Sequence, residues 1–131
     1  MKKPKIIKPT LLKGITLYEG KKDIGYIQLV SIGRGVIRPQ IEYKLKKPYR
    51  NKGIMTKELP LFLDKIKDEY PQIIAIVKED NIASSRVLDK VGFCRLSKIG
   101  DKDIYIRDFR IGVEKTEETI AKFNSLGLVD K

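Results

Sequence analysis

The sequence predicts an α/β fold in which helices lie on both faces of a mixed, mostly antiparallel sheet. Three β-rich runs follow one another near the start of the chain, two amphipathic segments flank a short apolar run in the middle, and two more β-rich runs precede a last helix. This order, β-β-β-α-β-α-β-β-α, combines hairpins with a helical crossover, so both antiparallel and parallel neighbours are expected. The length of 131 residues fits one hydrophobic core, and we expect residues 1–131 to form a single domain.

The first three strands are predicted by alternation and by turn residues. Ile15 to Glu19 and Ile24 to Val30 are β-rich, and the segment between them, Gly20 to Asp23, is typical of a hairpin loop. From Val36 to Leu45 hydrophobic and polar side chains alternate again, which predicts a third strand. Pro48 ends it, because proline has no N–H to donate to a neighbouring strand.

The middle of the chain predicts a helix followed by a buried strand. Between Gly53 and Tyr70, Pro60 interrupts an otherwise helical pattern, so we expect a bend or a loosened first turn there. Ile73 to Val77 is continuously apolar and of strand length, which suits a strand covered on both faces. The apolar stripe of the helix is formed by Met55, Leu59, Phe62, Ile66 and Tyr70.

A short helix from Ile82 to Val91 is expected to begin after the capping residue Asn81 and to end at Gly92. Its inward stripe is predicted to be Ala83, Val87 and Val91.

The end of the chain predicts a hairpin and a last helix. Cys94 to Ile99 and Ile104 to Phe109 are strand-like and are joined by a turn. The helix from Glu114 to Leu126 carries an apolar face of Ile120, Phe123 and Leu126.

Composition excludes several kinds of chemistry. The chain has no histidine, which rules out Ser-His-Asp and Cys-His nucleophiles, and no metal site is expected. The lone Cys94 cannot form an internal disulfide, no apolar run approaches the roughly 20 residues of a membrane span, and the basic start breaks off before a signal-peptide core. These features predict a cytoplasmic protein without a membrane partner.

The net charge of +11 indicates attraction to an anion, such as nucleic acid, a ribosome surface or a phosphorylated cofactor. The lysines are spread along the chain and the aromatic residues form no RNA-stacking motif, so nucleic acid is the less favoured partner.

One segment has the character of a phosphate-binding loop. It follows the third predicted strand and opens the first predicted helix, where free backbone N–H groups and the helix dipole favour an anion. A glycine in such a loop lets the backbone approach a phosphate closely. The segment consists of Arg50, Asn51, Lys52, Gly53, Ile54, Met55 and Thr56. An ordinary strand-to-helix turn is the alternative interpretation.

This loop, together with the helix that begins Asn81-Ile82-Ala83-Ser84 and ends Gly92-Phe93, resembles the two signature motifs of the GNAT acetyl-CoA-dependent N-acetyltransferases. The resemblance covers roughly residues 15 to 109 and is strongest to the branch of the ribosomal-protein N-terminal acetyltransferases. Met55 departs from the loop motif, which usually has Gly or Ala there, so its side chain is expected to point into the core. Little precedes the first predicted strand, so the chain looks like a minimal form of the family.

The resemblance implies acetyl-CoA as the acetyl donor and a primary amine as the acceptor, with direct transfer between them. It also implies that the extended pantetheine arm of acetyl-CoA pairs with the backbone around Tyr43, Leu45 and Lys46, and that Asn81 faces the same arm. Asn81 is equally explained as a helix cap.

Two side chains are candidates for moving protons. Many family members have a tyrosine where Leu88 stands, and that tyrosine is absent here. The Asn-x-x-Ser form resembles the ribosomal-protein branch, in which the serine hydroxyl lies near the sulfur, so the resemblance implies Ser84 as the candidate donor to the departing sulfur. The branch often has a glutamate at the position of Gln40, so Glu42, on the same face of the strand, is the candidate base. A solvated strand position is the alternative for Glu42, and a plain first-turn serine is the alternative for Ser84.

The rival to an enzyme is a binding module: a GNAT fold that binds coenzyme A without turnover, or that docks on a ribosome or nucleic acid. The sequence leaves the acceptor open among small-molecule amines, protein N-termini and lysines. Because the N-terminal part of the fold is short, the acceptor cleft is expected to be open or to be completed by the C-terminal helix or by another subunit, and a homodimer is one of these alternatives.

Overall fold

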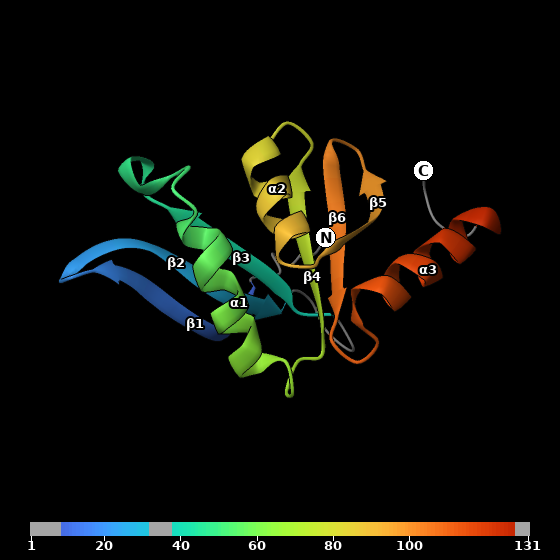
Figure 1. Ribbon diagram of the computed structural model, residues 1–131, viewed down its shortest axis with the longest axis horizontal. Helices are drawn as coiled ribbons and strands as arrows, with labels where there is room; N and C mark the ends of the chain where they lie inside the picture. Colours follow the sequence, from blue (N-terminus) through green and yellow to red (C-terminus); the bar gives the residue numbers. More distant parts are fainter. Residues whose placement is uncertain (1–8, 32–37, 128–131) are drawn as a thin grey trace, which may run out of the picture.

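The computed structural model describes residues 9–31 and 38–127 and has a six-stranded sheet in the order β1-β2-β3-β4-β6-β5 (Figure 1). Neighbouring strands are antiparallel except β3 and β4, which are parallel. The predicted mixed sheet and the predicted order of elements are confirmed. The elements are β1 (Thr10–Glu19), β2 (Lys22–Ser31), β3 (Gln40–Leu45), the short 3-10 helix η1 (Lys47–Tyr49), α1 (Ile54–Ile66), β4 (Gln72–Lys78), α2 (Ile82–Lys90), β5 (Cys94–Ile99), β6 (Lys102–Asp108) and α3 (Gly112–Ser125).

The first hairpin is longer than its sequence pattern suggests. β1 begins at Thr10 rather than Ile15, because it pairs with β2 as far as Ser31. The turn is correspondingly tighter than the predicted loop, since Glu19 already pairs with Lys22 and Gly20 takes a left-handed φ of 61°. The third strand is described only from Gln40, and the predicted start at Val36 lies outside the described residues.

One hydrophobic core joins the helices α1 and α2 to the sheet. The stripe predicted for α1 is confirmed, since Met55, Leu59, Phe62 and Ile66 are all buried. Tyr70 lies beyond the helix and is half-buried. The helix runs unbroken through Pro60, whose side chain is exposed.

The stripe predicted for α2 is partly wrong. Ala83 is exposed, whereas Leu88 is fully buried and belongs to the core. Residues three and four apart share a helix face, so a stripe through Ser84, Leu88 and Val91 excludes Ala83. The larger apolar side chain occupies the inward position, because burying it removes more apolar area from water.

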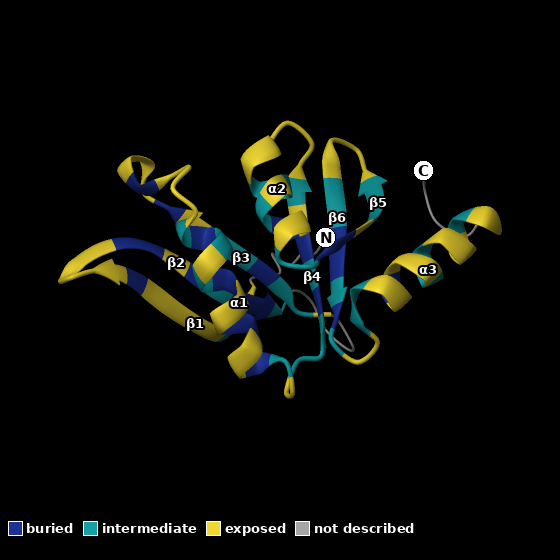
Figure 2. Ribbon diagram, viewed as in Figure 1, coloured by how far each residue is buried: buried dark blue, intermediate teal, exposed yellow. Residues whose placement is uncertain are grey.

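Helix α3 packs against the β5–β6 hairpin and is mostly exposed along its length (Figures 1 and 2). Of its predicted apolar face, Ile120 is half-buried, but Phe123 and Leu126 are exposed. The first turn of α3 is better anchored, with Thr116 buried and donating to the carbonyl of Gly112 at 2.6 Å.

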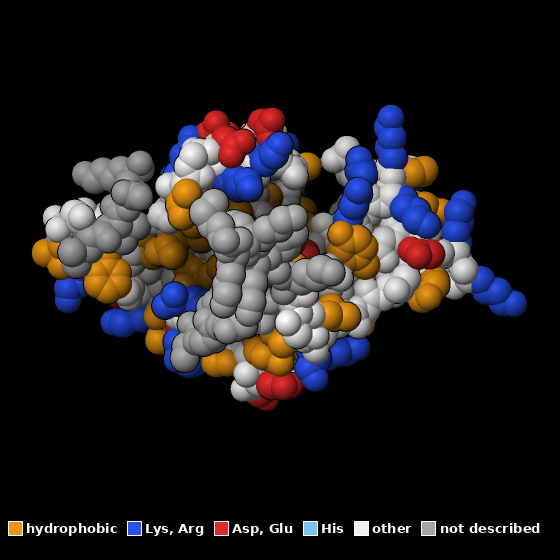
Figure 3. All heavy atoms as spheres, turned by 180° about the vertical axis from the view of Figure 1, so that it is seen from behind, with side chains coloured by type: hydrophobic (Ala, Val, Ile, Leu, Met, Phe, Trp, Pro, Cys, Tyr) orange, Lys and Arg blue, Asp and Glu red, His pale blue; other side chains and the backbone are white. Residues whose placement is uncertain are grey.

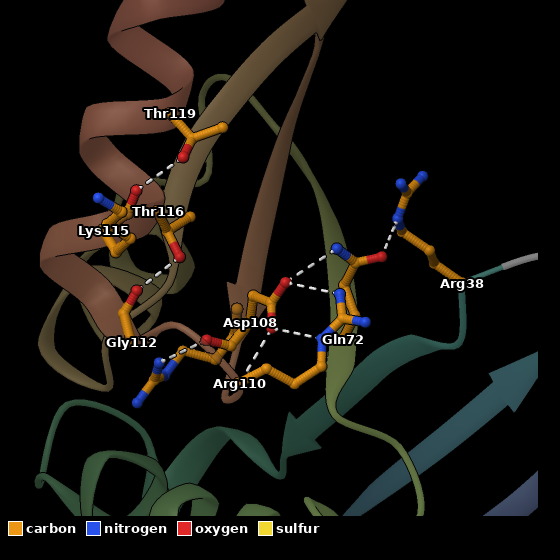
Figure 4. A network of polar contacts seen from close by, with 9 residues as sticks. Arg38, Gln72, Asp108, Arg110, Gly112, Lys115, Thr116 and Thr119 are labelled. Atoms are coloured by element: carbon orange, nitrogen blue, oxygen red, sulfur yellow. Dashed lines mark hydrogen bonds and ion pairs between the residues drawn. The ribbon is translucent and has the colours of Figure 1, made fainter.

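A polar network ties the start of β4 to the end of β6 (Figure 4). The buried carboxylate of Asp108 accepts hydrogen bonds from the guanidinium and backbone N–H of Arg110 at 2.9–3.0 Å and from the side-chain amide of Gln72 at 3.1 Å. The guanidinium of Arg38 donates to Gln72 in turn. These bonds hold the pKa of Asp108 below its ordinary value, chiefly through Arg110.

The helices of the described part are all shorter than a membrane span requires, and none is apolar enough to cross a bilayer.

Candidate functional site: a cleft between strands β3 and β4

The two parallel strands at the centre of the sheet separate soon after they meet. Their pairing is limited to Gln40 with Ile74, where the N–H of Ile74 donates to the carbonyl of Pro39 at 3.0 Å. Beyond this point β3 continues to Leu45 and β4 to Lys78 without a partner between them. The sheet is therefore open between the carboxyl ends of these strands.

Backbone groups of β3 point into this opening. The N–H of Lys46 donates to the carbonyl of Ile24 on β2, and hydrogen bonding alternates along an antiparallel pair. The backbone of Lys44 therefore also turns toward β2, while Ile41, Tyr43 and Leu45 turn toward the gap. Of the residues expected to pair with an extended ligand, Tyr43 and Leu45 face the gap, although the Leu45 carbonyl already accepts from Nε of Arg50. Lys46 does not face the gap, because its N–H is bonded to Ile24.

The opening leads into a cleft with a volume of about 520 Å³ beneath the first turns of α2. One wall comes from β3, one from β4, and the roof from α2 and the turn before it. The lining residues are Ile41, Tyr43, Ala75, Ile76, Val77, Lys78, Asp80, Asn81, Ser84 and Leu88.

The segment that follows β3 is a loop rich in free donors, outside the lining of the cleft. The N–H of Lys57 is the first in α1 to reach back to a carbonyl, that of Gly53 at 3.2 Å. In the described chain, no residue from Asn51 to Thr56 donates its N–H to a backbone acceptor. Consecutive unbonded N–H groups at the start of a helix form an anion-binding concavity.

The loop has this shape because two residues adopt left-handed backbone conformations. Gly53 has a φ of 76°, and a Cβ at this position would have no heavy atom within 4 Å, so the space beside its backbone is open. Asn51 also has a positive φ of 62°, which the sequence did not reveal. Arg50 fixes the start of the loop, since its Nε donates to the carbonyl of Leu45 at 2.9 Å.

The remaining loop side chains divide between core and solvent. Met55 is buried in the core, as its departure from the family motif predicts, so it leaves the backbone accessible. Lys52 is exposed, and Ile54 and Thr56 are half-buried. The loop therefore offers backbone N–H groups and positive charge rather than a fixed set of side-chain ligands.

Helix α2 begins as predicted. The side chain of Asn81 accepts a hydrogen bond from the N–H of Ser84 at 3.2 Å, which confirms the helix cap. Both residues line the cleft.

Sequence reasoning missed the side chain of Tyr43. Its hydroxyl lies 2.8 Å from Oγ of Ser84 and also donates to the Ser84 carbonyl at 3.3 Å. Burial raises the pKa of the Tyr43 phenol, although the hydrogen bond with Ser84 acts in the opposite direction. The alternation of the strand predicts that Tyr43 points toward the core face. Its contact with Ser84 could not be predicted, because that contact depends on how α2 packs on the sheet.

Glu42 lies on the other face of the sheet, because successive strand residues point to opposite faces. Its carboxylate accepts a hydrogen bond from the side-chain amide of Gln28 at 2.8 Å, and it is not part of the lining of the cleft. Glu42 and the Tyr43–Ser84 pair thus stand on opposite sides of the opening.

Cys94 has no accessible thiol. It is buried, its sulfur lies 3.8 Å from the carbonyl of Val113, and burial raises the pKa of the thiol. The residue therefore behaves as part of the packing rather than as an acyl carrier.

The two features that the resemblance rests on, the donor-rich loop and the capped helix α2, flank the opening between β3 and β4. Residues 8–94 match the family described as the acetyltransferase (GNAT) domain. The chain belongs to the GNAT family. Comparison with curated protein sequences gives no match.

Solved structures with the same fold include the ribosomal-protein-S5-alanine acetyltransferase from Vibrio fischeri, at 22% identity and a TM-score of 0.60, covering 66% of this chain and 55% of that one. A protein from Pyrococcus horikoshii is 27% identical with a TM-score of 0.61, covering 70% of this chain and 61% of its own. An aminoglycoside acetyltransferase in complex with coenzyme A is 18% identical with a TM-score of 0.65, and the match covers 79% of this chain and 69% of that one. This GNAT chain therefore spans little more than half the length of the first two.

The residues present fit a long ligand that carries phosphate at one end. The loop has unbonded N–H groups of the kind that bind phosphate, and the backbone of Tyr43 and Leu45 faces the gap in which an extended arm would lie. The cleft supplies the two hydroxyl groups at the far end of that path.

Proposed function

We propose that this GNAT chain is an acetyl-CoA-dependent N-acetyltransferase that moves an acetyl group directly to a primary amine. The observation that carries the proposal is the unbonded run of N–H groups from Asn51 to Thr56, set at the end of a strand whose inner edge is open. Coenzyme A has a pyrophosphate followed by an extended pantetheine arm, and these two parts match the loop and the open edge in that order. Acetyl-CoA would supply an activated acyl group as a thioester.

The loop binds the pyrophosphate mainly through its backbone in this proposal. Gly53 allows close approach, and exposed Lys52 and Arg50 add positive charge. The inner edge of β3 at Tyr43 and Leu45 orients the arm, and Asn81 faces it from the start of α2. The thioester then lies beside Ser84, whose hydroxyl is within reach of the departing sulfur.

The acceptor amine approaches from the face of Glu42. The neutral amine is the nucleophile, and its nitrogen must lose one proton after it attacks to form a neutral amide; a carboxylate can take that proton directly or through water. Glu42 is half-buried and already accepts from Gln28, so its position is fixed. A base on one side of the opening and an acid on the other suit a direct transfer, because the attacking nitrogen loses a proton while the departing sulfur gains one.

The core described above joins β1–β3 to β4–β6 through α1 and α2, which supports a chain that works as one domain. A cytoplasmic location is proposed because the single cysteine, Cys94, cannot form an internal disulfide, which fits a reducing compartment.

A second copy of the chain is the proposed protein partner, bound through the edge strand β1. In the described part of the chain β1 pairs only with β2, and Leu11 and Tyr18 on it are more than half exposed, at 61% and 62%. Antiparallel pairing of Thr16 with Thr16 of the other copy places Lys13 opposite Glu19 on both sides of the axis. Registers centred on Lys13 or Glu19 would oppose like charges, whereas the register centred on Thr16 places opposite charges together, and we propose that one.

This dimer has a register-specific test. Thr16→Cys should form a disulfide between copies under mild oxidation, because directly opposite Cα atoms lie about 5.5 Å apart in a hydrogen-bonded pair. Thr10→Cys, on the same strand but distant from the axis, should not. A monomer in sedimentation with no crosslink through Thr16→Cys would contradict the dimer.

The test of the enzyme is acetyl-CoA turnover, measured as thiol release against a panel of small amines, peptide N-termini and lysine peptides. Turnover with one class establishes the activity and names the acceptor. Coenzyme A binding without turnover on any amine would favour the rival binding module.

The rival that docks on nucleic acid makes a different prediction. Lys and Arg side chains occur on several parts of the face in Figure 3 and are most numerous at its right-hand end, and the sequence has no RNA-stacking motif beside them. RNA should therefore bind weakly, with steep salt dependence and no preferred sequence. Tight, sequence-selective binding at physiological salt would favour docking.

A further inference from the structure

The hydroxyl of Ser84 has one side-chain partner in the described structure, and that partner is the phenol of Tyr43. The two oxygen atoms are 2.8 Å apart, within the range of a good O–H···O hydrogen bond. Tyr43 comes from β3 and Ser84 from α2, so the bond crosses the cleft between the two walls. Nothing in the family motifs quoted above assigns a role to this phenol.

The chemistry of a serine acid makes such a partner necessary. A serine that gives its proton to sulfur becomes an alkoxide, which is far more basic than the thiolate it has just neutralised, so the transfer is unfavourable by itself. It becomes favourable if a second, stronger acid delivers a proton to Oγ in the same step. A phenol, with a pKa of about 10 in its ordinary environment, is such an acid.

We propose that Tyr43 acts behind Ser84 as a positioning residue that orients the serine hydroxyl and replaces the proton it gives up. The inference rests on the proposed acetyl transfer. As the nitrogen–carbon bond forms and the carbon–sulfur bond breaks, the electron pair of the latter leaves on sulfur. Ser84 gives its hydroxyl proton to that sulfur, and Tyr43 gives its phenolic proton to Oγ. The proton lost by the amine passes through Glu42 to solvent, and the phenolate takes one back from solvent, which closes the balance.

The surroundings of Tyr43 support this order of events. Burial raises the pKa of the Tyr43 phenol and disfavours the phenolate, so the phenol carries its proton before the transfer and the phenolate regains one after it. The other titratable groups near it are Tyr105, from β6, and Lys78 and Asp80, which line the cleft. Only Ser84 among the described side chains is hydrogen-bonded to the Tyr43 hydroxyl.

The test is Tyr43→Phe, which removes a single oxygen atom. We expect kcat to fall about 10- to 100-fold, the scale of one proton-transfer contribution, with KM for acetyl-CoA unchanged. Coenzyme A affinity measured by calorimetry, and the Tm, should also be unchanged. The double variant Tyr43→Phe with Ser84→Ala should be no slower than Ser84→Ala alone, because the phenol acts only through the serine. Tyr105→Phe is the matched control, since it removes a buried phenol from the adjacent region that has no bond to Ser84.

Three results would overturn the inference. Full kcat in Tyr43→Phe would remove any role for the phenol. Parallel losses of coenzyme A affinity, Tm and turnover would show that the hydrogen bond only holds α2 in place. Additive losses in the double variant would show that the two hydroxyls act separately. If the unaltered chain acetylates no amine, the proposed function fails and this inference fails with it, whereas turnover that survives in Tyr43→Phe rejects the phenol alone.

Discussion

The donor-rich loop and the hydroxyl pair occupy the two ends of the proposed cofactor path, and they are built in different ways. The loop from Asn51 to Thr56 presents main-chain N–H groups, and its geometry depends on the left-handed backbone of Gly53. The pair at the other end consists of side chains, Tyr43 and Ser84, carried by two separate elements. Coenzyme A affinity should therefore be sensitive to the backbone conformation of the loop and tolerant of side-chain changes there. The turnover rate should instead depend on the individual side chains of Tyr43 and Ser84.

The largest expected effect is at Gly53. Valine is β-branched and rarely adopts a φ near 76°, so Gly53→Val should displace the loop backbone and abolish the thermal stabilisation produced by coenzyme A. The circular dichroism spectrum should remain that of the folded chain. The matched control is Gly100→Val, because Gly100 has a φ of 61°, equally open space and a place in the β5–β6 turn. If coenzyme A stabilises both variants equally, the loop is not part of the binding site.

Ser84→Ala should act on turnover and leave binding nearly intact. Loss of one positioned donor in the transition state lowers kcat by about 10- to 1000-fold, with little change in acetyl-CoA affinity. Steady-state kinetics and calorimetry measure the two quantities. Ser85→Ala is the control, since the neighbouring serine has no bond to Tyr43. If binding and turnover fall together in Ser84→Ala, the residue serves the helix start and the contrast between the two regions fails.

A third change tests the scaffold that places the loop. Gly25 on β2 lies against the end of β3, and a Cβ there would come within 2.2 Å of the Lys44 carbonyl oxygen. Gly25→Ala should therefore reduce the free energy of unfolding by about 1–3 kcal/mol, as overpacking typically does. Chemical denaturation measures this, and Gly14→Ala on β1 is the control because its Cβ would meet only ordinary contacts at 3.5 Å or more. If Gly25→Ala and Gly14→Ala are equally stable, β2 and β3 move apart at this point with little loss of stability.

The smallest expected effect is an acid dependence away from the cleft. Because the pKa of Asp108 is lower in the folded chain, its carboxylate stabilises the fold above the unfolded pKa of about 4, and that contribution is lost as pH falls through the folded value. Asp108→Asn should lower stability at neutral pH and flatten the decline below about pH 4. Denaturation curves across this range, with Asp101→Asn in an exposed turn as control, measure the difference. If stability falls below about pH 4 as steeply in Asp108→Asn as in the unaltered chain, the acid dependence comes from other carboxylates.

The comparison also explains which parts could be predicted. The helix cap at Asn81, the inward direction of Met55 and the breaks at the glycines follow from local rules, since each depends on a few neighbouring residues. The inward stripe of α2 and the exposed end of α3 were misjudged, because which face is buried depends on the partner that packs against it. Phe123 and Leu126 have helical spacing and hydrophobic character, yet they remain exposed.

The sequence by itself determined the order of the elements and the family, because periodicity, turn residues and the two motifs are local properties of the chain. Only the tertiary structure decided the separation of β3 from β4 after Gln40 and the hydrogen bond between Tyr43 and Ser84. Tyr43 and Ser84 are far apart in sequence, and their contact depends on the twist of the sheet and the packing of α2 on it. No local pattern encodes a distance between two elements, since that distance is fixed by the side chains that fill the space between them.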